Sequence, residues 1–154
     1  MYFGLNFEAL LEEERALELS EFDTDAAMKL AMSVVNRAKA NGKRVAVSVS
    51  VGRQILFQYG SVGLGPNADH WMRRKANVVY EYHMSSLAYA AKLENEQSNM
   101  EIEARSGADF TAFGGAVPIR VKGAGVIGAI AMTGLDHMDD HEHLVTAIKE
   151  LMNS

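Results

Sequence analysis

Cysteine is absent from the 154-residue chain, and only two prolines occur, Pro66 and Pro118. Without cysteine, disulfides, thiol nucleophiles and cysteine-ligated zinc or iron–sulfur sites are excluded, and a reducing compartment is favoured. The chain also has no unbroken apolar run near the ~20 residues of a membrane span. Its N-terminal segment lacks the basic and apolar regions of a signal peptide. We therefore expect a cytoplasmic protein with no membrane association.

The chain also has fewer basic residues than acidic residues. Fifteen Lys and Arg residues stand against twenty Asp and Glu residues, which gives a formal net charge of −5. Because nucleic-acid phosphates are bound by basic surfaces, no nucleic-acid partner is expected. The hydrophobic content of 48% and charged content of 23% are those of an ordinary folded chain. At this length they predict a single domain over residues 1–154.

The first half of the chain has two helical patterns and a hairpin pattern. A helix over about residues 6–20 carries a glutamate-rich face, which we interpret as solvated, with a partner-binding face as the alternative. A second helix begins with a cap at Asp23 or Thr24. Residues 45–59 then alternate with a period of two around Gly52-Arg53, which predicts a β-hairpin with a type II′ turn.

The second half repeats the alternation of helix and hairpin. A long helical pattern opens at Asp69, and Ser85 is a candidate cap for a separate second segment. A hairpin spans about residues 117–133, and its second strand is rich in small residues that let a helix or another subunit approach closely. A final helix follows. Two hairpins separated by a helix imply an α+β fold, in which helices pack on an antiparallel sheet.

Histidine and carboxylate residues gather in the run Asp136–His143. If the run is helical, His137 and His141 share a face at a spacing that suits a metal ion. Acidic residues also favour helix N-termini, and Asp139 with Glu142 has capping-box spacing. We favour capping and assign no metal site; neutral His141 as a ligand or acid–base group is the other alternative. No catalytic residues can be assigned from order or motif.

Two further features are candidates for binding. Lys75 shares an apolar stripe with Trp71, and a lysine there needs a partner. A structural ion pair is the favoured interpretation, and an anionic ligand is the alternative. Gly114-Gly115 either turns the chain into the next strand or presents N–H groups to an anion.

These residues also form a recognisable pattern. The motif Gly114-Gly115-x-x-Pro118-Ile119, followed by a glycine-punctuated strand, resembles the haem-degrading-domain family, which includes GlcG-like proteins, HbpS and the C-terminal domain of PduO-type adenosyltransferases. The resemblance extends from about Asp23 to the C-terminus. A longer pattern is similar to an uncharacterised bacterial and fungal branch, on these residues: Asn67, Trp71, Arg73, Arg74, Lys75, Asn77, Val79, His83, Ser85, Ser86, Asp140 and His141.

The resemblance implies a profilin-like fold, in which helices flank an antiparallel sheet of about five strands. The residue patterns supply four strands, so we expect the fifth within residues 93–113. The resemblance also implies a homo-oligomer and makes haem a candidate cofactor.

Taken together, these observations favour an oligomeric domain that binds a small anionic or tetrapyrrole ligand. The expected site lies between the long helix and the third strand. It comprises Trp71, Lys75, His83, Gly114, Gly115 and Arg120. One alternative is an oligomeric protein-interaction or targeting factor without ligand chemistry. Another is an acid–base enzyme that uses His141 or His83.

Overall fold

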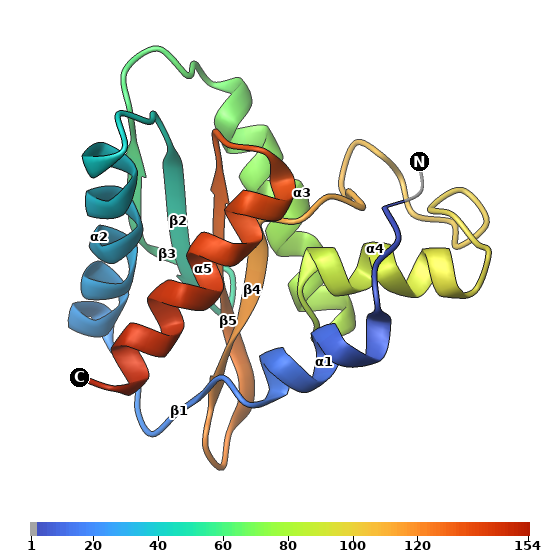
Figure 1. Ribbon diagram of the computed structural model, residues 1–154, viewed down its shortest axis with the longest axis horizontal. Helices are drawn as coiled ribbons and strands as arrows, with labels where there is room; N and C mark the ends of the chain where they lie inside the picture. Colours follow the sequence, from blue (N-terminus) through green and yellow to red (C-terminus); the bar gives the residue numbers. More distant parts are fainter. Residues whose placement is uncertain (1–2) are drawn as a thin grey trace.

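The computed structural model describes residues 3–154 (Figure 1). Helices and strands alternate along the chain much as the residue patterns predict. In chain order the elements are α1 (Phe7–Arg15), β1 (Glu18–Leu19), α2 (Thr24–Ala40), β2 (Ala46–Val51), β3 (Gln54–Gly60), α3 (Asn67–Tyr82), α4 (Ser86–Asn95), β4 (Ala116–Val121), β5 (Gly125–Thr133) and α5 (His137–Met152).

The strands form one sheet in the order β1-β4-β5-β2-β3. The pairings β4–β5, β5–β2 and β2–β3 are antiparallel, whereas β1 runs parallel to β4. The predicted α+β class is confirmed, with a mixed and mostly antiparallel sheet. The predicted place of the fifth strand is wrong. It is β1, because the first helix ends at Arg15 instead of continuing to residue 20.

The segment expected to contain that strand is irregular. Residues 96–115 run through successive turns and carry no strand. Two of them, Gln97 and Ala104, have positive φ of 54° and 56°. A left-handed backbone interrupts the extended conformation that a strand requires, so the chain folds back on itself here.

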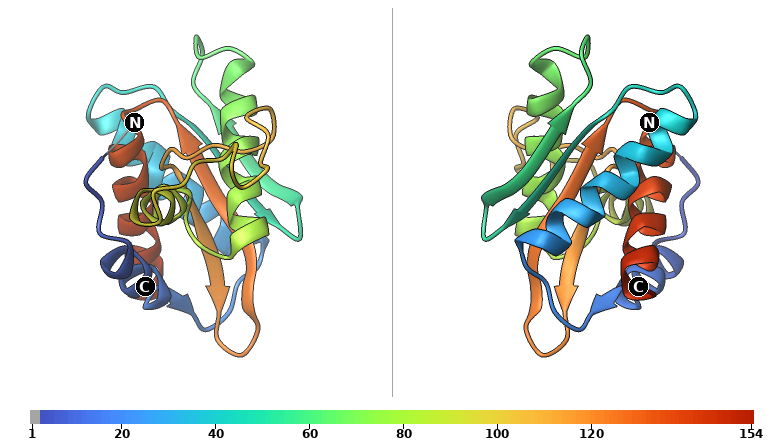
Figure 2. Two further views of the ribbon diagram at one scale, coloured as in Figure 1. Left: turned by 90° about the vertical axis from the view of Figure 1, so that its right-hand side faces the viewer. Right: turned by 90° about the vertical axis from the view of Figure 1, so that its left-hand side faces the viewer.

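The two faces of the sheet carry side chains of different sizes. Helices α2 and α5 cover one face and α3 covers the other, as Figures 1 and 2 show. The α2/α5 face presents branched and long side chains such as Val47, Val49 and Ile130. The α3 face presents mostly alanine: Ala46, Ala116, Ala129 and Ala131. The small residues predicted in the second hairpin therefore admit a helix, which packs close to the sheet backbone.

The turn between β2 and β3 differs from the expected type. Gly52 has φ of 56° and Arg53 has φ of 68°. Positive φ at both central residues is the pattern of a type I′ turn, whereas a II′ turn needs it only at the first. Arg53 is held in this conformation from α3. Its N–H donates to the Tyr80 hydroxyl at 3.1 Å, and its Nη1 donates to Asn77 Oδ1 at 2.6 Å.

Side-chain caps define where four helices of the described chain begin, including α1, which Asn6 caps. Of the two expected cap residues, Asp23 caps α2, and the candidate Ser85 caps α4. Helix α3 ends at His83, which has a left-handed φ of 57°. The final helix is capped by Asp136 and not at Asp139. It therefore begins a turn earlier than the capping-box spacing suggested, and both His137 and His141 lie on it. Among residues 3–154, no helix is long and apolar enough to span a membrane.

Gly128 gives a test of the close packing within the sheet. A Cβ at Gly128 would stand 2.0 Å from the carbonyl oxygen of Ser50 on β2, whereas a Cβ at Gly60 would meet nothing within 4 Å. We expect Gly128→Ala to lower the free energy of unfolding by about 1–3 kcal/mol, because overpacking forces the backbones apart. Gly60→Ala is the matched control and should stay within about 0.5 kcal/mol. Equal urea midpoints for the two variants would contradict this account of β5.

Candidate functional site

A buried ion pair joins the two helical layers. Lys75 Nζ lies 3.2 Å from Asp140 Oδ2 and donates to the carbonyl oxygen of Met132 at 2.9 Å. The side chains of Lys75 and Asp140 are 3% and 1% exposed. Since α3 and α5 lie on opposite faces of the sheet, Lys75 reaches Asp140 past the ends of β4 and β5. The predicted structural ion pair of Lys75 is thus present.

Gly115 makes this reach feasible. A Cβ on Gly115 would lie 2.5 Å from Lys75 Nζ and 2.8 Å from the carbonyl oxygen of Met132. Its φ of 128° is also one that residues with a side chain rarely adopt. Because Gly115 has no side chain, it leaves room for the lysine side chain next to the first residue of β4.

Burial dominates the ionisation of this pair. Loss of water raises the pKa of Asp140 to about 6, against the opposing attraction of Lys75. Burial likewise lowers the pKa of Lys75, although Asp140 favours its charged form. Asp140 Oδ1 also accepts a hydrogen bond from the Leu135 N–H at 3.2 Å. The carboxylate thus ties α3, the β5–α5 connection and α5 together.

Aromatic rings cluster beside this ion pair. The ring of Phe113 lies 5.9 Å from that of Trp71, 5.1 Å from that of His137 and 6.0 Å from that of Phe3, between centroids. The Arg74 guanidinium stands over Trp71 at 4.0 Å. Residues from the N-terminal segment, α3, α5 and the approach to β4 therefore meet around Phe113.

His137 has a defined hydrogen-bonding role in this cluster. Its Nδ1 accepts a hydrogen bond from the Gly114 N–H at 2.9 Å. Burial lowers the pKa of His137, and the charge of Lys75 lowers it further. A neutral imidazole that accepts at Nδ1 carries its proton at Nε2. In this arrangement His137 offers an N–H donor and no second lone pair.

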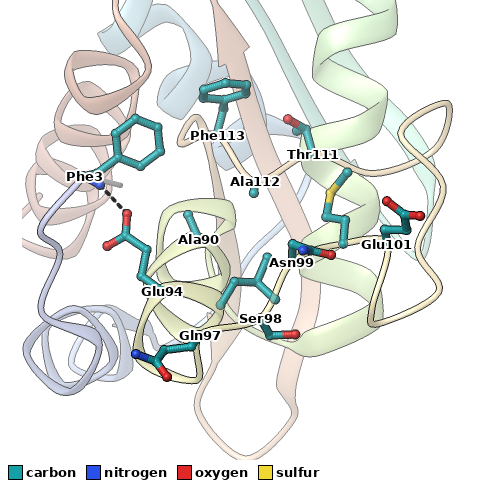
Figure 3. A pocket seen from close by; sticks show the side chains of 12 residues that line it. Phe3, Ala90, Glu94, Gln97, Ser98, Asn99, Glu101, Thr111, Ala112 and Phe113 are labelled. Atoms are coloured by element: carbon teal, nitrogen blue, oxygen red, sulfur yellow. Dashed lines mark hydrogen bonds between the residues drawn. The ribbon is translucent and has the colours of Figure 1, made fainter. Parts of the chain in front are cut away.

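Phe3 and Phe113 form one wall of a groove of about 740 Å³. Figure 3 shows both rings above α4, with Ala90 and Glu94 contributed by that helix and Asn99 by the segment that follows it. The full lining is Phe3, Ala90, Leu93, Glu94, Gln97, Ser98, Asn99, Met100, Glu101, Thr111, Ala112 and Phe113. The volume falls within the range of small-molecule sites.

Hydrogen bonds fasten the N-terminal segment across the end of the groove. The Glu94 carboxylate accepts from the backbone N–H groups of Phe3 and Leu5, the latter at 3.2 Å. One of the two acidic side chains that line the groove is therefore already engaged. Glu101, the other, is exposed.

Four of the six predicted ligand-binding residues come together. They lie around Phe113 and the N-terminal end of β4, behind the groove wall: Trp71, Lys75, Gly114 and Gly115. None of them lines the groove itself. Lys75 is enclosed by its partners, and Gly114 is packed against the carbonyl oxygen of His137.

His83 and Arg120 lie away from the other four. His83 is exposed at the end of α3, roughly 12 Å along the helix axis from Lys75. Arg120 is near the far end of β4, where its charge acts on Glu14 of α1. Glu14 is 2% exposed and accepts a hydrogen bond from the Ser85 N–H at 2.7 Å. One member of the glutamate run expected to be solvated is therefore buried.

The sequence reasoning missed the residues that form the groove. Phe113 directly precedes the glycine pair, so its place beside that motif was a usable signal. Phe3 and Met100 carried none, because the N-terminal segment and the irregular segment after α4 have no periodic pattern. His137 was considered only as a metal ligand.

His141 occupies a different environment, between α5 and α1. Its side chain is 1% exposed, and neither ring nitrogen has a hydrogen-bond partner within residues 3–154. Burial lowers its pKa to about 4, so the imidazole is neutral at pH 7. Its Nε2 lies 4.0 Å from Glu13 Oε1. An unpartnered buried polar group costs about 1–3 kcal/mol of folding free energy.

Comparison with known proteins places the chain in a family. Residues 22–149 match the family model described as haem degrading protein HbpS-like. The chain belongs to the HbpS-like family. A UPF0303 protein of Yersinia pestis (strain Pestoides F) is 33% identical over 144 residues, which cover 92% of this chain and 83% of that protein.

Solved structures share the fold of this HbpS-like chain at lower identity. The crystal structure of the Ybr137w protein has a TM-score of 0.88 at 24% identity, over 96% of this chain and 88% of that chain. A crystal structure of a PduOC–haem complex has a TM-score of 0.71 at 16% identity, over 83% and 93% of the two chains. These likenesses establish the fold, and the haem belongs to the PduOC structure.

The Lys75–Asp140 pair can be tested by a double-mutant cycle. We expect Asp140→Asn to destabilise the protein by about 3–5 kcal/mol, because it leaves a buried ammonium without its counter-charge. Lys75→Met combined with Asp140→Asn should be less destabilised than the sum of the two single variants, because the uncompensated charge is gone. Urea denaturation measures all four proteins. Strict additivity would show that the two side chains are not coupled.

Proposed function

We propose that this HbpS-like protein binds a small, planar ligand of the tetrapyrrole class in the groove between α4 and the Phe3–Phe113 wall. The observation that carries the proposal is an open groove of about 740 Å³ beside two phenyl rings. Ligand sites typically combine such apolar walls with a few polar groups. Flat aromatic rings in contact with a planar ligand add specific stacking to simple burial.

Charge near the groove favours one orientation of an anionic ligand. Glu94 and Glu101 lie on the side of α4 and the segment after it, where they repel carboxylates. Arg74 lies over Trp71, and Trp71 contacts Phe113. In this proposal, the apolar body of the ligand contacts the groove and its anionic groups extend toward Arg74.

Haem is the candidate cofactor that the family suggests. Its iron accepts a thioether or imidazole as axial ligand. Among the groove-lining residues that the structure describes, Met100 supplies a thioether and none is histidine. His137 is the nearest imidazole to the wall, and its Nδ1 is engaged by Gly114. The groove's volume, apolar wall and sulfur donor fit haem, and Met100 is the residue that would hold its iron.

The six residues expected from the sequence take different parts in this proposal. Trp71, Gly114 and Gly115 support the wall from behind, and Lys75 acts indirectly by fixing Gly115 and α5. For His83 and Arg120, we retain ligand binding only as a hypothesis, because neither lines the groove.

We further propose that the protein is a homo-oligomer formed through β3. This strand lies at the edge of the sheet and, within residues 3–154, has no strand on its outer side. Its sequence QILFQYG has no charge or proline, the features that normally protect an exposed edge. Ile55 on this strand is 56% exposed. A second copy pairing with β3 would cover both the open backbone groups and this side chain.

Haemin titration tests the groove. We expect wild-type protein to bind one haemin per chain and to shift its Soret band. Phe113→Ala should bind haemin at least tenfold more weakly, because the variant lacks one of the two phenyl rings of the groove wall. Phe22→Ala, at a half-buried phenylalanine before α2 that does not line the groove, is the matched control and should bind as wild type does. Met100→Leu keeps the apolar volume and should change the spectrum more than the affinity. Wild-type protein that leaves the haemin spectrum unchanged would refute the tetrapyrrole proposal.

Sedimentation velocity tests the oligomer. We expect wild-type protein to sediment above the monomer mass at micromolar concentration, and Ile55→Lys to shift it toward the monomer by placing a charge on the edge. Val62→Lys makes the same change at a side chain 94% exposed in the loop before α3, and it should leave the oligomer intact. A monomeric wild type, or equal effects of the two variants, would rule out pairing through β3.

A further inference from the structure

Three metal-ligand side chains meet between α1 and α5, outside the groove. Glu13 of α1 and His141 and Glu142 of α5 each offer one donor atom, and these donor atoms lie within 4.8 Å of one another. We infer that this cluster binds a divalent transition-metal ion of the zinc class. The inference is independent of the groove and its ligand, because none of the three residues lines the groove.

His141 separates this cluster from an ordinary group of surface carboxylates. Its imidazole is 1% exposed and has no hydrogen-bond partner at either nitrogen among the described residues. Buried polar atoms nearly always have partners in folded proteins. The Nε2 atom lies 4.0 Å from Glu13 Oε1, so this ring nitrogen borders the place where the carboxylates gather.

The donor set fits zinc better than the harder alkaline-earth ions. Imidazole nitrogen with carboxylate oxygen is a ligand combination that zinc accepts, whereas calcium and magnesium select oxygen alone. In a tetrahedral site with bonds of ~2.0–2.1 Å, donors lie about 3.3 Å apart. Glu13 and Glu142 are half-buried and exposed, so rotation of their side chains can close the remaining distance. Water would complete the fourth position.

The charges around the cluster favour a dication, with one opposing group. Glu13 and Glu142 contribute two negative charges. Lys149 opposes the metal, since its Nζ lies 3.9 Å from Glu13 Oε2. At 54% exposure this side chain can move into solvent.

A metal at this place would link the N-terminal helix to the body of the protein. Glu13 belongs to α1, which lies outside the residues 22–149 that match the family model. His141 and Glu142 lie within them. The bound ion would therefore stabilise the docking of α1 on α5, and this effect can be measured without any assay of activity.

The site is tested by titrating the whole chain with zinc chloride and measuring the binding by calorimetry. We expect one Zn²⁺ per chain and at least tenfold weaker binding for both Glu13→Gln and Glu142→Gln. Glu12→Gln removes the same charge from an exposed position of α1 and should stay within twofold of wild type. Lys149→Gln should bind a few-fold more tightly. Carboxylate variants are preferred to a His141 variant because that side chain is buried and its loss endangers folding.

Two readouts make the outcome decisive. Co²⁺ should give visible absorption bands of a four-coordinate site in wild-type protein and not in Glu142→Gln. Zn²⁺ should raise the melting temperature of wild-type protein but not that of Glu13→Gln, because only the folded state assembles the donors. The inference is overturned by absence of one-to-one binding in wild type. Equal loss in Glu12→Gln also overturns it, because that result would indicate nonspecific attraction to the acidic surface.

Discussion

The arrangement of the molecule depends on one ion pair that passes the end of the sheet. Lys75 and Asp140 belong to helices on opposite faces, and they meet at 3.2 Å because Gly115 leaves the space between them open. Charges this deeply buried must be paired and hydrogen-bonded. The pair therefore fixes the position of α5 relative to α3. It thereby sets the position of the first turns of α5, which carry both His137 and His141.

Two histidines near the start of α5, His137 and His141, lie in separate environments. His137 turns its Nδ1 to Gly114 and its ring to Phe3 and Phe113, at the wall of the groove. His141, one turn later, lies against α1 and faces Glu13. Burial lowers the pKa of each imidazole. Within residues 3–154, His137 has a hydrogen-bond partner that accounts for its orientation and His141 has none.

The N-terminal segment completes both environments. Phe3 supplies a wall of the groove and is held there by the Glu94 carboxylate, while Glu14 anchors α1 to the start of α4 through the Ser85 N–H. Phe3 and Glu14 precede the part of the chain that matches the HbpS-like family model, whereas Glu94 and Ser85 lie within it. The family core thus provides the sheet, the ion pair and α5, and the preceding segment determines which surfaces of that core are enclosed.

The sequence by itself determined the elements with strong periodicity, which are α2, the two hairpins and the α+β class. It marked Asp23 or Thr24, and Ser85, as candidate helix caps. It also marked Lys75 as a residue that needs a partner, because a charge on an apolar stripe is costly wherever it lies. Only the tertiary structure decided that the partner is Asp140, that the fifth strand is β1, and that Phe3 and Phe113 form a wall. Those outcomes depend on contacts between segments far apart in the chain, and such contacts leave no local pattern in either segment.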